Sequence, residues 1–184
     1  MLQNTSAKAY IITALLELLH QKTFSSITVK EIVKRAGISR STFYVYYYDK
    51  YDLLDQLSKD IINEFLAFYP QAKKRHNHHL KVEETTKDIC NHVFFYQSFY
   101  KEQFQNPQFI HHLSRELSAA LMHVYNHKSY ASFSSYGTVG FLAEWVYDSF
   151  QMTPEEAAIE LRKIGTTDWS ASHTDMKTVN FKEN

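Results

Sequence analysis

Residues 28–54 read TVKEIVKRAGISRSTFYVYYYDKYDLL, and this stretch decides the fold of the N-terminal part of the chain. Thr28 followed by Glu31 is typical of a capping box, because each side chain satisfies a backbone N–H group of the other at a helix N-terminus. Gly37 supplies the left-handed residue that commonly ends such a helix, and Ser39 caps a second short helix. Two short helices joined by a tight turn predict a helix-turn-helix.

The second of these helices, residues 39–46, is polar on its outer face. Phe43 is expected to face inward, and the residues expected to face outward are Arg40, Ser41, Thr42, Tyr44 and Tyr46. A short helix with an exposed polar surface is the shape that the major groove of DNA accepts. The sequence therefore predicts a head that binds double-stranded DNA.

Apolar residues recur at helical spacing on both sides of this stretch. A helix is expected before it, at about residues 5–22, and Asp49 caps a helix that continues until Pro70. The further helices are predicted at residues 82–100, from Asn106-Pro107 to about 124, at 129–150, and from Thr153-Pro154 to Gly165. Residues 71–81 are polar and predict a linker, and residues 166–184 lack periodicity and predict a loose tail.

The predicted fold is therefore all-α. An N-terminal three-helix domain with the helix-turn-helix is expected over residues 1–48, and a helical bundle for dimerisation and effector sensing over residues 49–184. Only 4 glycines and 3 prolines occur among 184 residues, which favours helices over a turn-rich β fold.

The net charge of zero conceals an asymmetry between the two parts. Residues 1–50 hold seven basic and three acidic side chains, whereas the rest of the chain holds thirteen and seventeen. A basic head suits a polyanionic partner. The single cysteine, Cys90, fits a reducing compartment. With a polar N-terminus and no apolar run long enough for a membrane span, the sequence predicts a cytoplasmic protein with no membrane partner.

Residues 8–58 resemble the DNA-binding head of the TetR/AcrR family. The capping box, the turn, the Thr-Phe-Tyr run at 42–44 and the Asp-Lys-x-Asp-Leu-Leu run at 49–54 all fall in register. Tyr47 and Tyr51 depart from the family, which usually has Phe and Glu there. Residues 144–156 resemble, more weakly, the C-terminal signature of the DhaS-like branch.

The resemblance implies a homodimer that binds a palindromic operator, with repression as the default mechanism. It also implies a small-molecule effector that releases the dimer from DNA or modulates its binding. The residues expected to contact DNA are Thr28, Lys30, Ser39, Arg40, Ser41, Thr42, Tyr44, Tyr46 and Lys50. Arg40 is expected at a guanine edge or a phosphate, and Thr28, Lys30 and Lys50 at phosphates. The alternatives are an adaptor or activator controlled by a partner protein, and a zinc-responsive regulator.

The zinc alternative depends on the ten histidines. His123 and His127 are spaced i, i+4, which suits a zinc pair on one helix. The residues considered for completing the site are Cys90, His92, His111 and His112, but no spacing fixes a third ligand, so metal binding stays open. Cys90 and His92 are two residues apart and face different ways on a helix, and no catalytic motif accompanies them. The sequence predicts no enzyme activity and no cofactor.

Overall fold

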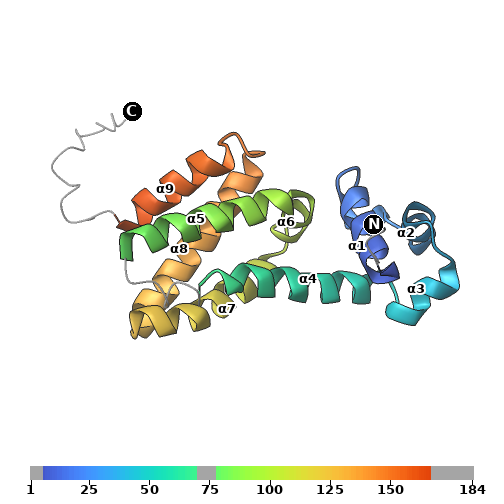
Figure 1. Ribbon diagram of the computed structural model, residues 1–184, viewed down its shortest axis with the longest axis horizontal. Helices are drawn as coiled ribbons and strands as arrows, with labels where there is room; N and C mark the ends of the chain where they lie inside the picture. Colours follow the sequence, from blue (N-terminus) through green and yellow to red (C-terminus); the bar gives the residue numbers. More distant parts are fainter. Residues whose placement is uncertain (1–5, 70–77, 167–184) are drawn as a thin grey trace, which may run out of the picture.

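The computed structural model describes residues 6–69 and 78–166, and over these residues the chain forms nine α-helices and one 3-10 turn, η1 (Figure 1). The elements are α1 (Ala7–Leu19), η1 (Phe24–Ser26), α2 (Val29–Ala36), α3 (Arg40–Tyr46), α4 (Lys50–Ala67), α5 (His78–Phe95), α6 (Gln97–Gln103), α7 (Pro107–Tyr125), α8 (Lys128–Tyr147) and α9 (Pro154–Thr166). The prediction of an all-α fold with an N-terminal helix-turn-helix is confirmed.

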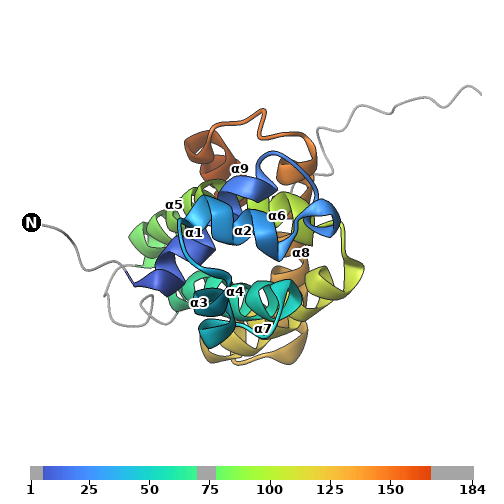
Figure 2. The same ribbon diagram turned by 90° about the vertical axis from the view of Figure 1, so that its right-hand side faces the viewer.

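The first three helices form a head around a small apolar core. Ile11 and Leu15 of α1, Ile32 of α2 and Phe43 of α3 are all fully buried. Because α1 packs against both α2 and α3, it holds the two short helices at a fixed angle. In Figure 1, α3 lies at the end of the molecule farthest from α9. Figure 2 views the molecule from that end, so the head is in front.

Helix α4 leads from the head into the body (Figure 1). In the body, α7 packs along α8 and α5 packs along α9, while α4 contacts α7. Contacts between α1 and α6 add a second connection between head and body. The domain boundary predicted at residues 48 and 49 stays a prediction, since α4 is continuous from the head to the bundle.

The body differs from the sequence prediction at one long helix. The helix expected over residues 82–100 is two helices, α5 and α6, which are separated at Tyr96. No glycine or proline marks this break. The break at Tyr96 places Phe99 and Tyr100 in the core, where both are 0% exposed. Helix α5 also begins at His78, so the linker expected over 71–81 is wrong for its last four residues. The earlier part of that linker lies outside the described residues.

Two helix ends fall elsewhere than expected, and the two histidines considered as a zinc pair lie on different elements. Asn126 adopts a left-handed conformation with φ of 49° and ends α7 before His127. The two histidines at 123 and 127 are therefore not on one helix, and His127 is instead the N-cap residue of α8. Gly165 lies within α9 rather than after it. Helix α1 stops at Leu19, before its expected end at about residue 22, and η1 follows at Phe24–Ser26. The tail beyond residue 166 lies outside the described part.

The corner between α8 and α9 is an aromatic cluster with local backbone strain. Ser149 and Phe150 both have positive φ, 56° and 58°, which costs free energy in a non-glycine residue. The buried Trp145 donates its indole N–H to the Met152 carbonyl at 2.9 Å and packs edge-on against Phe150. Thr153 and the carboxylate three residues later then form a capping box at the start of α9, as the sequence predicts.

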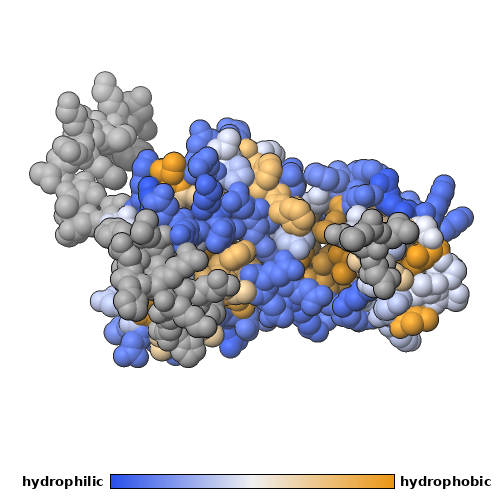
Figure 3. Space-filling view, viewed as in Figure 1, coloured by the Kyte–Doolittle hydropathy of each residue, from blue (hydrophilic) through white to orange (hydrophobic). Residues whose placement is uncertain are grey.

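The face of the molecule in Figure 3 is mostly hydrophilic, with apolar patches over the body helices and near the junction of head and body. Within the described ranges, no helix is long and apolar enough to cross a bilayer.

Candidate nucleic-acid interface

Helix α2 begins with the predicted capping box. The Glu31 amide donates to the Thr28 hydroxyl at 3.3 Å, and the Thr28 amide donates to the Glu31 carboxylate at 2.9 Å. Lys22 binds the other carboxylate oxygen at 2.6 Å. The hydrogen bonds from Lys22 and Thr28 lower the pKa of Glu31 to about 2. The start of α2 is therefore held by a carboxylate that stays charged throughout the physiological range.

The turn between α2 and α3 has the geometry that the sequence predicts. Gly37 has φ of 67°, a left-handed conformation that L side chains rarely adopt. Ser39 caps α3, because its hydroxyl accepts from the Thr42 amide at 3.0 Å. Phe43 points into the core of the head, so the opposite side of α3 faces solvent. The result is a helix-turn-helix whose second helix is exposed at one end of the molecule (Figure 2).

Arg40 and Tyr44 form a pair on the exposed side of α3. The guanidinium lies over the Tyr44 ring, 5.6 Å from its centroid, and one of its N–H groups donates to the Tyr44 hydroxyl at 3.1 Å. Both side chains are exposed. A guanidinium stacked in this way loses less conformational freedom when it contacts a base or a phosphate.

The other residues expected at DNA divide into two groups. Ser41 and Tyr46 are exposed on α3, and Lys30 is exposed near the N-terminus of α2. The hydroxyls of Ser39 and Thr42 bond one another at 2.7 Å, and Ser39 also bonds Ser41 at 2.7 Å, so Ser39 has a capping role of its own. The Thr28 hydroxyl likewise donates within the capping box, to Glu31 at 2.8 Å.

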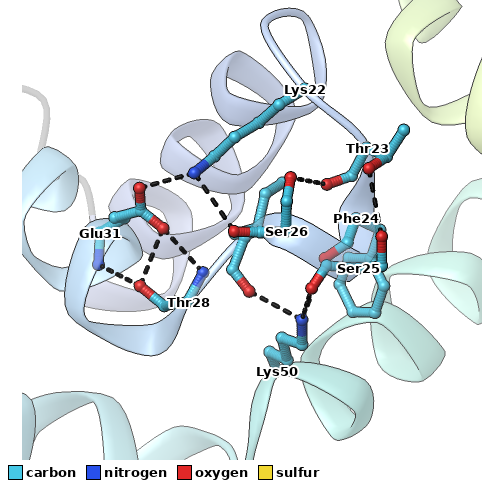
Figure 4. Close-up of polar contacts among 9 residues, drawn as sticks. Lys22, Thr23, Phe24, Ser25, Ser26, Thr28, Glu31 and Lys50 are labelled. Carbon is cyan, nitrogen blue, oxygen red and sulfur yellow. Dashed lines mark hydrogen bonds and ion pairs between the residues drawn. The ribbon is translucent and has the colours of Figure 1, made fainter.

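Lys50 is placed differently from the other expected contacts. Its ammonium donates to the carbonyls of Phe24, Ser25 and Ile27, which belong to η1 and the residue after it (Figure 4). The side chain is only partly exposed, and its charge points at the head's own backbone.

Two further residues on this surface were missed from the sequence. Val45 is 77% exposed and Tyr48 is 86% exposed. The signal was available: with Phe43 and Tyr47 pointing inward, helical periodicity places positions 41, 44, 45 and 48 outward. An apolar side chain in such a position suits the methyl group of thymine.

The residues considered for zinc or catalysis have other roles in the structure. Burial raises the pKa of the Cys90 thiol to about 12, so it stays protonated and unreactive near neutral pH. His92 is bound to the Tyr100 hydroxyl at 3.1 Å, and His111 to the Tyr136 hydroxyl at 2.8 Å. In the part of the chain that the structure describes, no three His, Cys, Asp or Glu residues lie close enough to hold a metal ion. The side chain of His123 lies outside that part.

Comparison with known proteins gives consistent results. The family model of bacterial regulatory proteins of the tetR family matches residues 11–57. The HTH-type transcriptional regulator YxbF of Bacillus subtilis (strain 168) is 26% identical over 166 residues, which cover 82% of this chain and 42% of YxbF. The chain thus spans less than half the length of that relative.

Solved structures share the fold over nearly the whole chain. A TetR-family transcriptional regulator from Syntrophomonas wolfei str. Goettingen has a TM-score of 0.71 at 16% identity, covering 97% of this chain and 100% of its own. A TetR-like regulator from Rhodococcus sp. RHA1 has a TM-score of 0.67 at 15% identity, covering 89% and 96%. The dihydroxyacetone kinase operon activator DhaS has a TM-score of 0.68 at 16% identity, covering 86% and 93%. These likenesses show the fold, and assignment to the DhaS-like branch stays a prediction.

A helix-turn-helix with an exposed second helix, carried on an all-helical body, defines a DNA-binding transcriptional regulator. Residues 11–57 match the family model of tetR bacterial regulatory proteins, and the fold of the described residues is that of TetR-family regulators.

Proposed function

We propose that two copies of this chain bind a palindromic DNA operator through α3, and that an effector bound by the body changes their affinity for it. The observation that carries the proposal is that Arg40, Tyr44 and Val45 are exposed on α3, the helix at the end of the molecule farthest from α9 (Figure 1). Occlusion of a promoter, and so repression, is the default outcome of such binding. A cytoplasmic location follows from the same proposal.

The outer face of α8 supports the homodimer. Exposed residues recur there at alternating spacings of three and four, which is the spacing of a helix-pairing seam, and they are Tyr130, Phe133, Gly137, Gly140 and Glu144. Phe133 is 75% exposed. The space above both glycines is open, so a second helix is able to approach the α8 backbone closely.

A small-molecule effector is favoured by one buried polar group in the body. Ser114 of α7 has 0% exposure, and its hydroxyl has no hydrogen-bond partner among the described residues. A buried hydroxyl without a partner is costly, and a polar group of a bound ligand would satisfy it. An adaptor or activator controlled by a partner protein is the second candidate, and a zinc-responsive regulator finds no further support in the described part of the chain.

The proposal is tested by fluorescence anisotropy of the purified protein on DNA fragments from around its own gene and on scrambled DNA, at two salt concentrations. Tight binding that depends on sequence, with two subunits per site, supports it. Equal affinity for every fragment argues against a sequence-specific head at these sites and favours action through a partner protein.

Replacing Arg40 with Ala tests base recognition directly. We expect a loss of roughly 1–3 kcal/mol on the best sequence and a relaxed preference at one position in each half-site. The matched control is Arg35→Ala, because Arg35 is paired with Glu17 at 2.7 Å and lies on α2. Anisotropy on a set of single-base variants measures both, and an equal loss on every sequence would make Arg40 a phosphate contact instead.

A further inference from the structure

Tyr48 lies in the connection between α3 and α4, and its side chain makes little contact with the rest of the fold. It is 86% exposed, more than Tyr44, Tyr46 or Tyr51 on either side of it. Each of those three rings has an aromatic neighbour in the head, at 5.5 to 6.5 Å between ring centroids. Within residues 6–69 and 78–166, the Tyr48 ring has no such neighbour and its hydroxyl has no hydrogen-bond partner. The ring and the hydroxyl are therefore available to a partner.

The backbone of Tyr48 is held in place, in contrast to its side chain. Its amide donates to one carboxylate oxygen of Asp52 at 2.8 Å, and the other oxygen accepts from the Gln56 side chain at 3.0 Å. The hydrogen bonds from Gln56 and from the Tyr48 amide lower the pKa of Asp52, so its carboxylate stays charged near neutral pH. On one side Tyr47 is buried, and on the other Asp49 caps α4. Little backbone freedom therefore remains to be lost when the side chain binds a partner.

Tyr48 follows directly after the C-terminal end of α3, whose C-cap residue is Tyr47. In a helix-turn-helix, the N-terminal residues of the second helix contact the base edges. The C-terminal end of that helix then points toward the wall of the major groove, where the sugar–phosphate strand runs. The connection from α3 to α4 lies at the same end of the molecule as α3 (Figure 1). An exposed side chain one residue beyond the C-cap is thus placed to meet the strand rather than a base.

The chemistry of the Tyr48 side chain suits a sugar–phosphate strand. Tyrosine hydroxyls are among the groups that bind phosphate oxygens, and an aromatic ring buries a large apolar surface when it packs on the carbons of a sugar. The carboxylates of Asp49 and Asp52 repel a phosphate, but both are bonded to backbone amides at the base of the side chain. The hydroxyl is at the far end of the ring from that backbone, so a phosphate bound to it need not approach either carboxylate.

We propose that Tyr48 is a DNA-contacting residue, which packs its ring on a sugar of the operator and donates its hydroxyl to the adjoining phosphate. This inference rests on the proposed function, and it adds to the expected contacts a residue outside α3. Because the contact is uncharged, it strengthens binding to every sequence and releases no counterion. The dependence of affinity on salt therefore separates Tyr48 from a lysine contact such as the one expected of Lys30, which is exposed on α2.

The first experiment follows the nitration of tyrosines by tetranitromethane with mass spectrometry, in the free protein and on operator DNA. Tyr48 is expected to react quickly in the free protein, because it is so exposed, and several-fold more slowly on the operator. Tyr125, which is exposed on α7, is the control and should react equally in both states. Equal nitration of Tyr48 with and without DNA overturns the inference.

The second experiment measures operator affinity against salt for Tyr48→Phe, Tyr48→Ala and Lys30→Met, at a temperature where thermal unfolding shows all of them to be folded. Tyr48→Phe is expected to bind about fivefold more weakly, because one hydrogen bond is lost. Tyr48→Ala is expected to bind about thirtyfold more weakly, because the ring contact is lost as well. Both should keep the wild-type salt slope, whereas Lys30→Met should lower it by about 0.9. The matched control, Tyr125→Ala, should bind as the wild type, and a lowered slope for Tyr48→Ala overturns the uncharged contact.

A third measurement locates the phosphate. Operators in which one phosphate is replaced by an uncharged methylphosphonate are titrated with the wild type and with Tyr48→Phe. At one position in each half-site, Tyr48→Phe is expected to cost little further affinity, because both changes remove the same contact. Additive losses at every position reject the bond between the hydroxyl and a phosphate.

Failure of this inference is distinguishable from failure of the proposed function. If a folded Tyr48→Ala protein binds the operator as tightly as the wild type, the inference is wrong while the proposed function stands. If the wild-type chain prefers no DNA fragment, the proposed function fails, and the inference fails with it.

Discussion

At the scale of single residues, Val45 is the least expected feature of the surface proposed to face DNA. It lies between two tyrosines on α3, and at 77% exposed it is more open to solvent than either Tyr44 or Tyr46. An exposed valine side chain does not stabilise the folded monomer. Its burial against a thymine methyl group would stabilise a complex with DNA. We therefore expect Val45 to contribute to base preference.

Replacing thymine with uracil in the operator removes only the 5-methyl group and tests this directly. The wild-type protein is expected to lose about fourfold in affinity at one position per half-site, the value of one buried methyl group. Val45→Ala should be insensitive to the same change, whereas Val124→Ala, an exposed valine on α7, should behave as the wild type. Anisotropy titrations measure this, and equal sensitivity of the Val45→Ala protein would exclude the contact.

Residue roles that depend on near neighbours are predictable from the sequence. The capping residues Thr28, Ser39, Asp49 and Asn106 all cap as expected, because each bonds an amide two or three positions along the chain. Lys50 shows the limit of such reasoning. Its carbonyl partners are more than twenty residues away, and only the packing of α4 against η1 brings them together.

At the scale of elements, α4 is fixed at both ends. Its N-terminus is capped by Asp49 and bound to η1, while its second half meets α5 and the break between α5 and α6. There the Tyr96 hydroxyl donates to Glu64 at 2.9 Å, and His92 lies 3.9 Å from the same carboxylate. Because both ends are held, a shift of the body that moves α4 must also disturb the head.

The buried His92 makes this second attachment sensitive to acid. Its side chain is only 5% exposed, and burial lowers its pKa from 6.5 to about 4, although a hydrogen bond with the Ile61 backbone opposes the fall. The groups that face it are Glu64 of α4, Tyr96 at the α5–α6 break and Tyr100 of α6. The folded state therefore holds His92 neutral under conditions where the unfolded chain protonates it.

We expect the free energy of unfolding contributed by His92 to be complete above pH 6.5 and to fall by roughly 3 kcal/mol as the pH drops to 4. Urea unfolding across this pH range measures the change. His92→Gln should be less stable at pH 7 but should show a shallower pH dependence. The control is His112→Gln, an exposed residue on α7, which should leave the dependence as it is. A steep wild-type slope that persists in His92→Gln would assign it to another group.

The elements themselves were predictable where their ends carry a chemical signal. Helix α2 ends at Gly37 and helix α7 begins at Pro107, both as expected. The break between α5 and α6 has no such signal, because Tyr96 is an ordinary helical residue and only tertiary packing of the following aromatics favours the bend.

At the scale of the whole molecule, the proposed dimer seam on the outer face of α8 would determine how two heads are arranged. A basic head needs a partner head to read a palindrome, and the spacing of the two is set by the helices that join the bodies. The exposed glycines of α8 suit such a seam because nothing lies within 4 Å of a side chain added there.

Gly140→Arg is expected to convert a dimer to a monomer, because a long charged side chain would then stand in the seam. Light scattering after size-exclusion chromatography should give twice the chain mass for the wild type and one chain mass for the variant. Ala119→Arg, which changes a small exposed residue on α7 in the same way, should stay dimeric. A Gly140→Arg protein that remains a dimer would place the interface elsewhere.

The corner between α8 and α9 also provides an optical probe of the whole assembly. The chain has two tryptophans, so Trp169→Phe leaves Trp145 as the only indole fluorophore. Its ring is 1% exposed, bonded to the Met152 carbonyl and in edge contact with Phe150, all of which favour short-wavelength emission. Because α8 carries the proposed seam and lies beside α7, a red shift on adding DNA or a candidate effector would report rearrangement at this corner without any attached label.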